Sequence, residues 1–302
     1  MLTVFSTPKP NGPSGNWGQR IAAWRFLSKP WPEKLKSIRY HWLKWFPSVP
    51  LPVKLPYGAF WLAENDLSGF AIILGGFENA ECAFVERFLR PGMIVLDIGA
   101  HHGFYTLLGS KKVGSTGRVL AFEPSPRERK RLRRHIWFNQ CKNVTVWECA
   151  LGRAEGNADL FVVDGAETGF NSLRPPNASQ PTKTLSVRVA TLDDCLSREG
   201  IERVDFVKMD VEGAEIEVLN GATRLLDRHP RPALMCEVQD IRTTPWGYPA
   251  KAIVDFLRQR GFQWFSLSDD DELIPVASVE TEFDGNYIAI PEERIFEVCR
   301  RN

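Results

Sequence analysis

The chain has 302 residues, which is enough for one large α/β domain with an appendage or for two small domains. It is 43% hydrophobic and 25% charged, as soluble globular proteins usually are. The net charge of +1 argues against a general nucleic-acid binder. The six cysteines form no CxxC pair or zinc-like cluster, and we see neither a signal peptide nor an apolar run long enough for a bilayer. These features predict free thiols and a cytoplasmic location.

Residues 1–56 differ in composition from the rest and predict a basic, tryptophan-rich arm followed by a proline-rich connector. Trp17, Trp24 and Trp31 recur at heptad spacing, and Pro30 and Pro32 divide the arm into two short helices. Three interpretations stay open. The arm is a lid packed on the main domain, which we favour, an interfacial helix on the inner face of an anionic membrane, or a nucleic-acid contact.

The main domain is predicted over residues 57–302, with its core at about 92–290. It begins with a hairpin over residues 57–77 and a helix over 79–89. Strands and helices then alternate, which predicts an α/β fold with a parallel sheet covered on both faces. An insertion over 156–189 predicts two strands around a polar loop, and 262–267 with 286–290 predicts a terminal strand pair. The alternating strands are expected at 93–98, 118–123, 144–149, 204–210 and 233–238, and the helices at 103–112, 127–139, 193–199, 215–226 and 249–259.

The most informative motif is VLDIGAHHG at residues 95–103, followed by LAFEP at 120–124. Gly99 permits a sharp turn after the first strand, and Gly103 permits a ligand to approach the start of the helix. Backbone N–H groups from Ala100 to Phe104 face that ligand with the positive end of the helix. The pattern lacks the third glycine of a pyrophosphate site, and Asp97 before the turn suits a cationic or hydrogen-bond-donating ligand instead.

Glu123 ends the second strand, where a carboxylate can accept both hydroxyls of a ribose, and Pro124 fixes the exit of the chain. Taken alone, the turn could be a tight structural connection and Glu123 a solvated acid. Together they favour a ribose-bearing cofactor.

Two more acids are expected at the ligand-binding edge of the sheet. Asp210 and Glu237 end adjacent parallel strands, so that they could bind a divalent cation, share a proton or deprotonate a hydroxyl. Alternatively, Glu237 forms an ion pair with Lys208, which needs a partner within its apolar strand. Asp97 and Glu237 are its candidate partners. Glu215 is expected to charge the start of the next helix.

The chain resembles the FkbM-type S-adenosylmethionine-dependent methyltransferases over residues 81–291. The resemblance rests on these motifs, on NVTVWECALG and TLDD, and above all on DFVKMDVEGAEIEVLNGA at residues 205–222. It implies a Rossmann-like, seven-stranded class I methyltransferase sheet with helices on both faces and an antiparallel last strand. It also implies S-adenosylmethionine as cofactor and methyl transfer to oxygen, often to a hydroxyl of a sugar or natural product.

The resemblance assigns cofactor contacts to the turn at Asp97, Gly99 and Gly103, to Glu123, to the polar loop with Asn171 and Ser172, and to Asp210 and Glu212 of the DVEG signature. His101 departs from the pattern because an asparagine usually stands there, and His102 is also unusual. We expect His101 to contact the cofactor rather than to be catalytic. Asp210 and Glu237 are the candidate bases, acting directly or through a metal.

Three other classes of protein can be built on the same type of sheet. An NAD-dependent oxidoreductase would favour GxGxxG and a Tyr-x-x-x-Lys pair, and residues 57–302 of the main domain contain neither. A noncatalytic cofactor-binding module would keep Asp97 and Glu123 but could lose Asp210 and Glu237, and all four are present. A nucleic-acid methyltransferase would usually show an Asn/Asp-Pro-Pro-aromatic motif, which is absent. The expected partner is therefore a small-molecule hydroxyl acceptor and not a nucleic acid.

Overall fold

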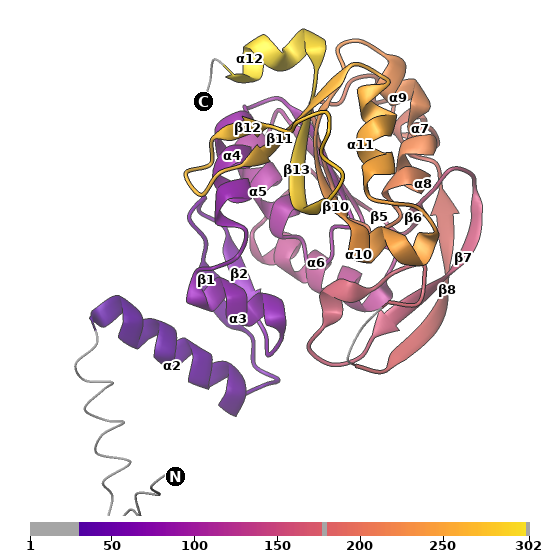
Figure 1. The fold of residues 1–302 in the computed structure, drawn as a ribbon. Coiled ribbons are helices and arrows are strands. Elements are labelled where there is room, and N and C mark those ends of the chain that lie inside the picture. Colours follow the sequence, from indigo (N-terminus) through magenta and orange to yellow (C-terminus); the bar gives the residue numbers. More distant parts are fainter. Residues whose placement is uncertain (1–29, 177–179, 300–302) are drawn as a thin grey trace, which may run out of the picture.

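The structure is a computed structural model that describes residues 30–176 and 180–299. Its centre is an eight-stranded sheet in the order β12-β11-β13-β10-β9-β3-β4-β5 (Figure 1). The strands are β3 (Ile94–Ile98), β4 (Arg118–Phe122), β5 (Val144–Trp147), β9 (Phe206–Met209), β10 (Ala233–Gln239), β11 (Phe262–Leu267), β12 (Leu273–Pro275) and β13 (Asp284–Pro291).

The direction of the last strand confirms the predicted fold class. β3, β4, β5, β9 and β10 are mutually parallel, and β13 runs antiparallel between β10 and β11. The structure therefore has the Rossmann-like, class I methyltransferase sheet with a reversed last strand. The short strand β12 adds an eighth, antiparallel edge to the seven strands that were expected.

Helices cover both faces of this sheet (Figure 1). Val95 and Val119 point to the face with α4 and α5, whereas Leu96 and Leu120 point to the face with α7, α8, α9 and α11, as strand alternation requires. The helices are α4 (Asn79–Phe88), α5 (Phe104–Val113), α6 (Pro126–Phe138), α7 (Leu192–Arg198), α8 (Glu215–Asn220), α9 (Thr223–Asp227), α10 (Asp240–Thr243), α11 (Lys251–Arg258) and α12 (Ile295–Cys299).

The single helix expected over residues 215–226 is two helices, α8 and α9. Gly221 lies between them and packs so closely on another loop that a Cβ atom there would come within 2.1 Å of the Gly152 carbonyl oxygen. This close contact explains why the helix is interrupted at a glycine.

The hairpin expected over residues 57–77 is wrong. β2 (Phe60–Ala63) pairs with β1 (Leu51–Lys54), which lies upstream in the connector, and residues Leu67–Leu74 form helix α3. The Asp66 carboxylate caps α3 by accepting a hydrogen bond of 2.7 Å from the Gly69 N–H, so the apolar run is helical rather than extended. In the arm, α2 (Trp31–Trp45) is present, and the other expected helix lies outside the described residues.

The insertion has the two strands that were expected. β7 (Gly156–Val163) and β8 (Thr182–Ala190) are antiparallel, and β6 (Ala150–Leu151) joins them in a second sheet. A 3-10 turn at Thr168–Phe170 and a bridge between Phe161 and Ser172 shape the loop between β7 and β8. Within the described parts of the chain, no helix has the length and apolar character needed to cross a membrane.

Candidate active site

The glycine turn after β3 is fixed by its neighbours on both sides. Gly99 has φ +78°, and a Cβ atom there would lie 1.8 Å from the Asp210 carbonyl oxygen, so no other residue fits without a backbone shift. The N–H groups of Gly99 and Ala100 both donate to the Phe122 carbonyl, at 3.0 and 2.9 Å. The turn is thereby tied to the ends of β4 and β9.

Gly103 has a different reason to be glycine from the one expected. Its φ is +91°, and a Cβ atom would lie 2.4 Å from Cδ1 of the buried Leu132 on α6. Gly103 lines neither of the two cavities described below. The close approach at this position is therefore made by a core side chain, and α5 begins immediately after it at Phe104.

Glu123 follows β4 and is 5% exposed. One carboxylate oxygen accepts the His101 N–H at 2.8 Å, and the other accepts the Ser125 N–H at 2.7 Å. Burial raises the pKa of Glu123 to about 8, although these two N–H groups oppose the rise. Each oxygen keeps a further lone pair, so the side chain can still receive hydrogen bonds from a ligand.

Glu123 lies in the wall of a cavity at the carboxyl ends of β3, β4 and β9, called the first cavity below. Its wall is largely apolar, and its polar groups include Glu123, Asp210 and the predicted loop residues Asn171 and Ser172. An apolar slot with a few polar groups is typical of a nucleoside site. The wall also includes Ile98, Gly99, His101, Phe122, Pro124, Ala150, Leu151, Leu160, Thr168 and Glu212.

A second cavity adjoins the first, and Gly99, His101, Gly169, Asp210 and Glu212 line both. Its wall combines aromatic rings with charged groups and includes residues from β2, α3 and the insertion loop. The other lining residues include Trp61, Leu67, Ser68, Ala71, Phe77, Glu78, Asp97, Ala100, His102, Phe104, Tyr105, Glu167, Phe170, Lys208, Glu237 and Arg242.

Asp97 lies in the wall of the second cavity and not in that of the first. It is 2% exposed and accepts a hydrogen bond from the Thr106 hydroxyl. Burial raises its pKa to about 6, so the Asp97 side chain titrates close to neutral pH.

Lys208 is buried in β9, and its expected pairing with Asp97 or Glu237 is wrong. Its ammonium nitrogen donates to an Asp210 carboxylate oxygen at 3.2 Å and to the Asn286 amide oxygen at 3.1 Å. Asn286 lies opposite Glu237 in the register of β10 and β13. The reversed last strand thus supplies the second partner of the lysine.

Asp210 and Glu237 lie together, as expected for the ends of adjacent strands. Burial alone would raise the pKa of Asp210, but the Lys208 ammonium holds it below its usual range. Burial raises the pKa of Glu237 well above its usual range, and the Asp210 carboxylate adds to the rise. At neutral pH, Asp210 is therefore the carboxylate and Glu237 the carboxylic acid, with a hydrogen bond between them.

Glu212 joins this acidic group and is paired with a second cation. Its carboxylate lies 3.0 Å from the Arg242 guanidinium nitrogen Nε. Burial and the nearby Asp210 raise the pKa of Glu212 to about 8. Carboxylate oxygens of Asp210, Glu212 and Glu237 lie within 4.8 Å of one another, which is close enough for a cation site.

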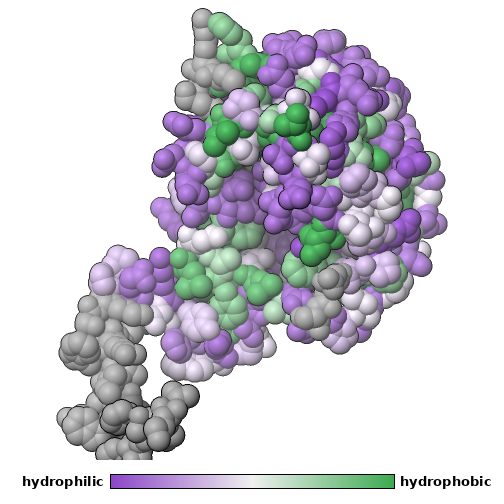
Figure 2. All heavy atoms as spheres, in the orientation of Figure 1, coloured by the Kyte–Doolittle hydropathy of each residue, from purple (hydrophilic) through white to green (hydrophobic). Residues whose placement is uncertain are grey.

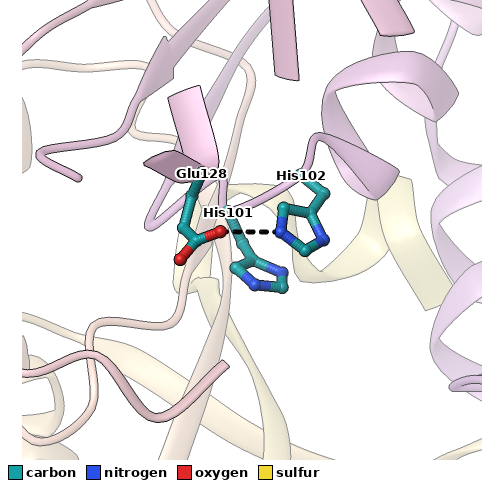
Figure 3. Close-up of side chains that lie close together, drawn as sticks. All are labelled: His101, His102 and Glu128. Atoms are coloured by element: carbon teal, nitrogen blue, oxygen red, sulfur yellow. Dashed lines mark hydrogen bonds and ion pairs between the residues drawn. The ribbon is translucent and has the colours of Figure 1, made fainter. Parts of the chain in front are cut away.

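The two unusual histidines stack on each other with ring centroids 3.6 Å apart (Figure 3). His101 has φ +50°, and its Nε2 lies 3.0 Å from the Thr168 hydroxyl in the insertion loop. His102 is fully buried, with its Nε2 2.8 Å from the Glu128 carboxylate. Burial lowers the pKa of both rings well below the usual value, so both are neutral at pH 7.

Glu128 is the residue that sequence reasoning missed. Besides His102, its carboxylate binds the Arg127 guanidinium and accepts a hydrogen bond of 3.0 Å from the Asn171 amide. In the sequence it looks like an ordinary acid in the first turn of a helix. Its contacts join the glycine turn, α6 and the insertion loop in one network.

Three features define a class I methyltransferase domain. They are the sheet with its reversed last strand, the glycine turn after β3, and the acid Glu123 at the end of β4. The Methyltransferase FkbM domain model matches residues 97–264, more than half of the chain, which confirms the family that the motifs indicated. The chain belongs to the FkbM methyltransferase family.

Several curated proteins are similar to this chain. Methyltransferase 1 of Beauveria bassiana is 30% identical over 161 residues, which is 47% of this chain and 62% of that protein. The 2-O-methyltransferase NoeI of Sinorhizobium fredii is 26% identical over 180 residues, 56% of this chain and 72% of that protein. The ribosomal RNA large subunit methyltransferase E of Buchnera aphidicola is 28% identical over 118 residues, 38% of this chain and 56% of that protein. The chain thus spans less than two thirds of the first and third of these proteins.

Proposed function

We propose that this protein transfers a methyl group from S-adenosylmethionine to a hydroxyl oxygen of a small molecule. The observation that carries the proposal is the position of the Asp210 carboxylate in the walls of both cavities. A residue at this junction can reach both a cofactor in the first cavity and an acceptor in the second. When bound, S-adenosylmethionine supplies an already activated methyl group on its sulfonium, so the protein must position the acceptor, remove its proton and exclude water.

The first cavity fits the nucleoside part of this cofactor. Glu123 offers lone pairs for two ribose hydroxyls, and Phe122, Leu151 and Leu160 supply an apolar wall for a base. His101 contributes a neutral ring to the wall of both cavities, so it adds no positive charge beside a sulfonium.

Asp210 is the proposed base and Glu237 a positioning residue. Lys208 keeps Asp210 ionised, and the protonated Glu237 donates a hydrogen bond to it. Oε2 of Glu237 is buried and has no partner among the described residues. An acceptor hydroxyl in the second cavity would give its proton to Asp210, and a second hydroxyl of a polyhydroxylated acceptor would donate a hydrogen bond to this Glu237 oxygen.

The second cavity favours a neutral or cationic polyhydroxylated acceptor over a nucleic acid. Trp61, Phe104 and Phe170 offer flat apolar surfaces, and the carboxylates beside them can accept hydroxyl protons. The wall contains six acids (Glu78, Asp97, Glu167, Asp210, Glu212 and Glu237) against Lys208 and Arg242. The acids that stay ionised, Asp210 among them, repel phosphate groups, which dominate the binding of nucleic acids.

We further propose that the reaction needs no divalent metal. The three carboxylates that could hold one have the hard oxygen donors that magnesium prefers. However, Lys208 and Arg242 already supply positive charge to Asp210 and Glu212 at hydrogen-bonding distance. A chelator is therefore expected to leave turnover unchanged, and restoration of turnover by added Mg²⁺ would show that the metal is required.

The test compares the wild-type protein with Asp210→Asn. Calorimetric titration with S-adenosylmethionine should give similar affinities for both, because Glu123 and the turn are intact in the variant. Turnover in a screen of sugar and phenolic hydroxyl acceptors should fall by about a thousandfold or more in the variant. Asp227→Asn is the matched control, since this exposed carboxylate lines neither cavity. A fully active Asp210→Asn variant would refute the assignment of the base, and a folded wild-type protein that binds no cofactor would refute the function.

A further inference from the structure

Helix α2 packs on the domain through one face only. Leu43 is fully buried on that face, and the Tyr40 ring lies 5.1 Å from the Phe70 ring of α3. The helix lies at the outside of the domain beside α3 (Figure 1). Its inner face is thus accounted for by packing on the domain.

The opposite face of α2 is an exposed apolar stripe. Trp31, Ile38, Trp42 and Trp45 are 70%, 47%, 37% and 72% exposed. Their spacings of seven, four and three residues place them on one side of the helix. Leu74 of α3 is also 52% exposed, and Figure 2 shows hydrophobic residues gathered on the surface around α3.

Positive charges accompany the stripe. α2 contains Lys34, Lys36, Arg39 and Lys44 but a single acid, Glu33, which pairs with Lys36 at 3.3 Å. The sequence before α2 has a similar composition, because residues 1–30 include four basic residues and two tryptophans but no acid. Tryptophan beside lysine and arginine is the composition of helices that lie in the interface of an anionic bilayer.

We propose that α2 docks this protein on an anionic membrane surface, with its axis in the plane of the interface and the tryptophan stripe among the lipid headgroups. A second copy of the chain fits the stripe less well, because two such helices would bring like charges together. Each basic residue near an anionic leaflet adds attraction that salt weakens. The inference does not depend on the proposed methyl transfer.

Docking in this way would bring the second cavity close to the lipid. Leu67, Ser68 and Ala71 of α3 line that cavity, and α2 packs directly on α3. The membrane would then limit the directions from which an acceptor can enter.

Flotation of the full-length protein with lipid vesicles tests the proposal. We expect flotation with vesicles that contain phosphatidylserine, little with phosphatidylcholine alone, and release at high salt. The double variant Trp42→Ser/Trp45→Ser should bind at least about tenfold more weakly. Both side chains are exposed, so the fold should survive, and circular dichroism with a denaturant titration checks this. Trp137→Ser is the matched control, because this tryptophan is 77% exposed but lies on α6.

The remaining outcomes overturn the proposal. Equal flotation of the double variant and the Trp137→Ser control would remove the stripe from the contact. Failure to float, combined with a dimer in ultracentrifugation that the double variant abolishes, would assign the stripe to a second copy of the chain. Stronger retention of a single-stranded RNA than of anionic vesicles would assign it to a nucleic acid.

Discussion

Gly103→Ala tests whether the glycine turn is constrained by a ligand or by the protein core. The substituted residue would keep φ near +91°, which costs about 1–2 kcal/mol for a residue with a side chain. Its Cβ atom would also lie 2.4 Å from Leu132 Cδ1, more than 1 Å inside an ordinary carbon–carbon contact. Overpacking of this kind costs about 1–3 kcal/mol, so we expect the free energy of unfolding to fall by about 2–5 kcal/mol in total.

A second substitution separates the two contributions. Leu132→Ala alone should cost about 2–5 kcal/mol, because Leu132 is fully buried against Ala100 and Ala121. The double variant Gly103→Ala/Leu132→Ala removes the overlap but not the backbone strain. Its loss should therefore be smaller than the sum of the two single losses by about 1–3 kcal/mol.

Guanidinium unfolding of the four proteins of this cycle measures the coupling. Titration with S-adenosylmethionine should show that affinity returns in the double variant to within a few fold of that of Leu132→Ala. Additive losses within about 0.5 kcal/mol would refute the role of Leu132. Restored stability without restored affinity would show that Gly103 serves the ligand after all.

Two further predictions concern charged groups. Lys208→Met removes the cation that holds the pKa of Asp210 down, so burial should raise that pKa. The acidic limb of the pH–rate profile should then move upward by about one pH unit or more. An unmoved limb would contradict the role of Lys208. Glu293 hydrogen-bonds Arg231, which lowers its pKa to about 2. Because this pKa is depressed in the folded state, its stabilising effect is complete above pH 4.5 and is lost as the pH falls toward 2. After a discount for partial exposure, Glu293→Gln should lower the free energy of unfolding in urea by about 1–2 kcal/mol at pH 7 and by roughly half of that or less at pH 3. Equal losses at both pH values would contradict this linkage.

The central sheet could be predicted because each buried strand leaves a short apolar run between turn residues. The failure at residues 57–77 has a local cause, since the run GFAIILGG suits a buried strand or a short buried helix equally well. The Asp66 side chain decides for the helix by capping it, and β2 then pairs with the upstream β1. The hydrophobic periodicity of so short a segment cannot predict the effects of a helix cap and a partner strand that act together.

The hydrogen-bond network around His101 and His102 could not be predicted from the sequence, for another reason. His101, Thr168, Asn171 and Glu128 come from the turn, the insertion loop and α6, and they meet only after the loop has folded over the edge of the sheet. No spacing rule connects residues in three separate elements. Asn171 was found through the family motif, whereas Glu128 had no local signal beyond its place in a first helical turn.

The acidic pair Asp210 and Glu237 shows which part of the site's chemistry can be predicted from strand order alone. Parallel pairing of β9 with β10 was enough to predict that Asp210 and Glu237 lie close together, but it left three uses open for two adjacent carboxylates. The choice among them depends on Lys208, whose second contact, Asn286, belongs to the reversed strand 78 residues downstream. With the ammonium directed at Asp210, that residue stays ionised and Glu237 takes the proton. Lys208 thus makes the two acids unequal, and the proposed roles need this inequality, with Asp210 as the base and Glu237 as the positioning residue.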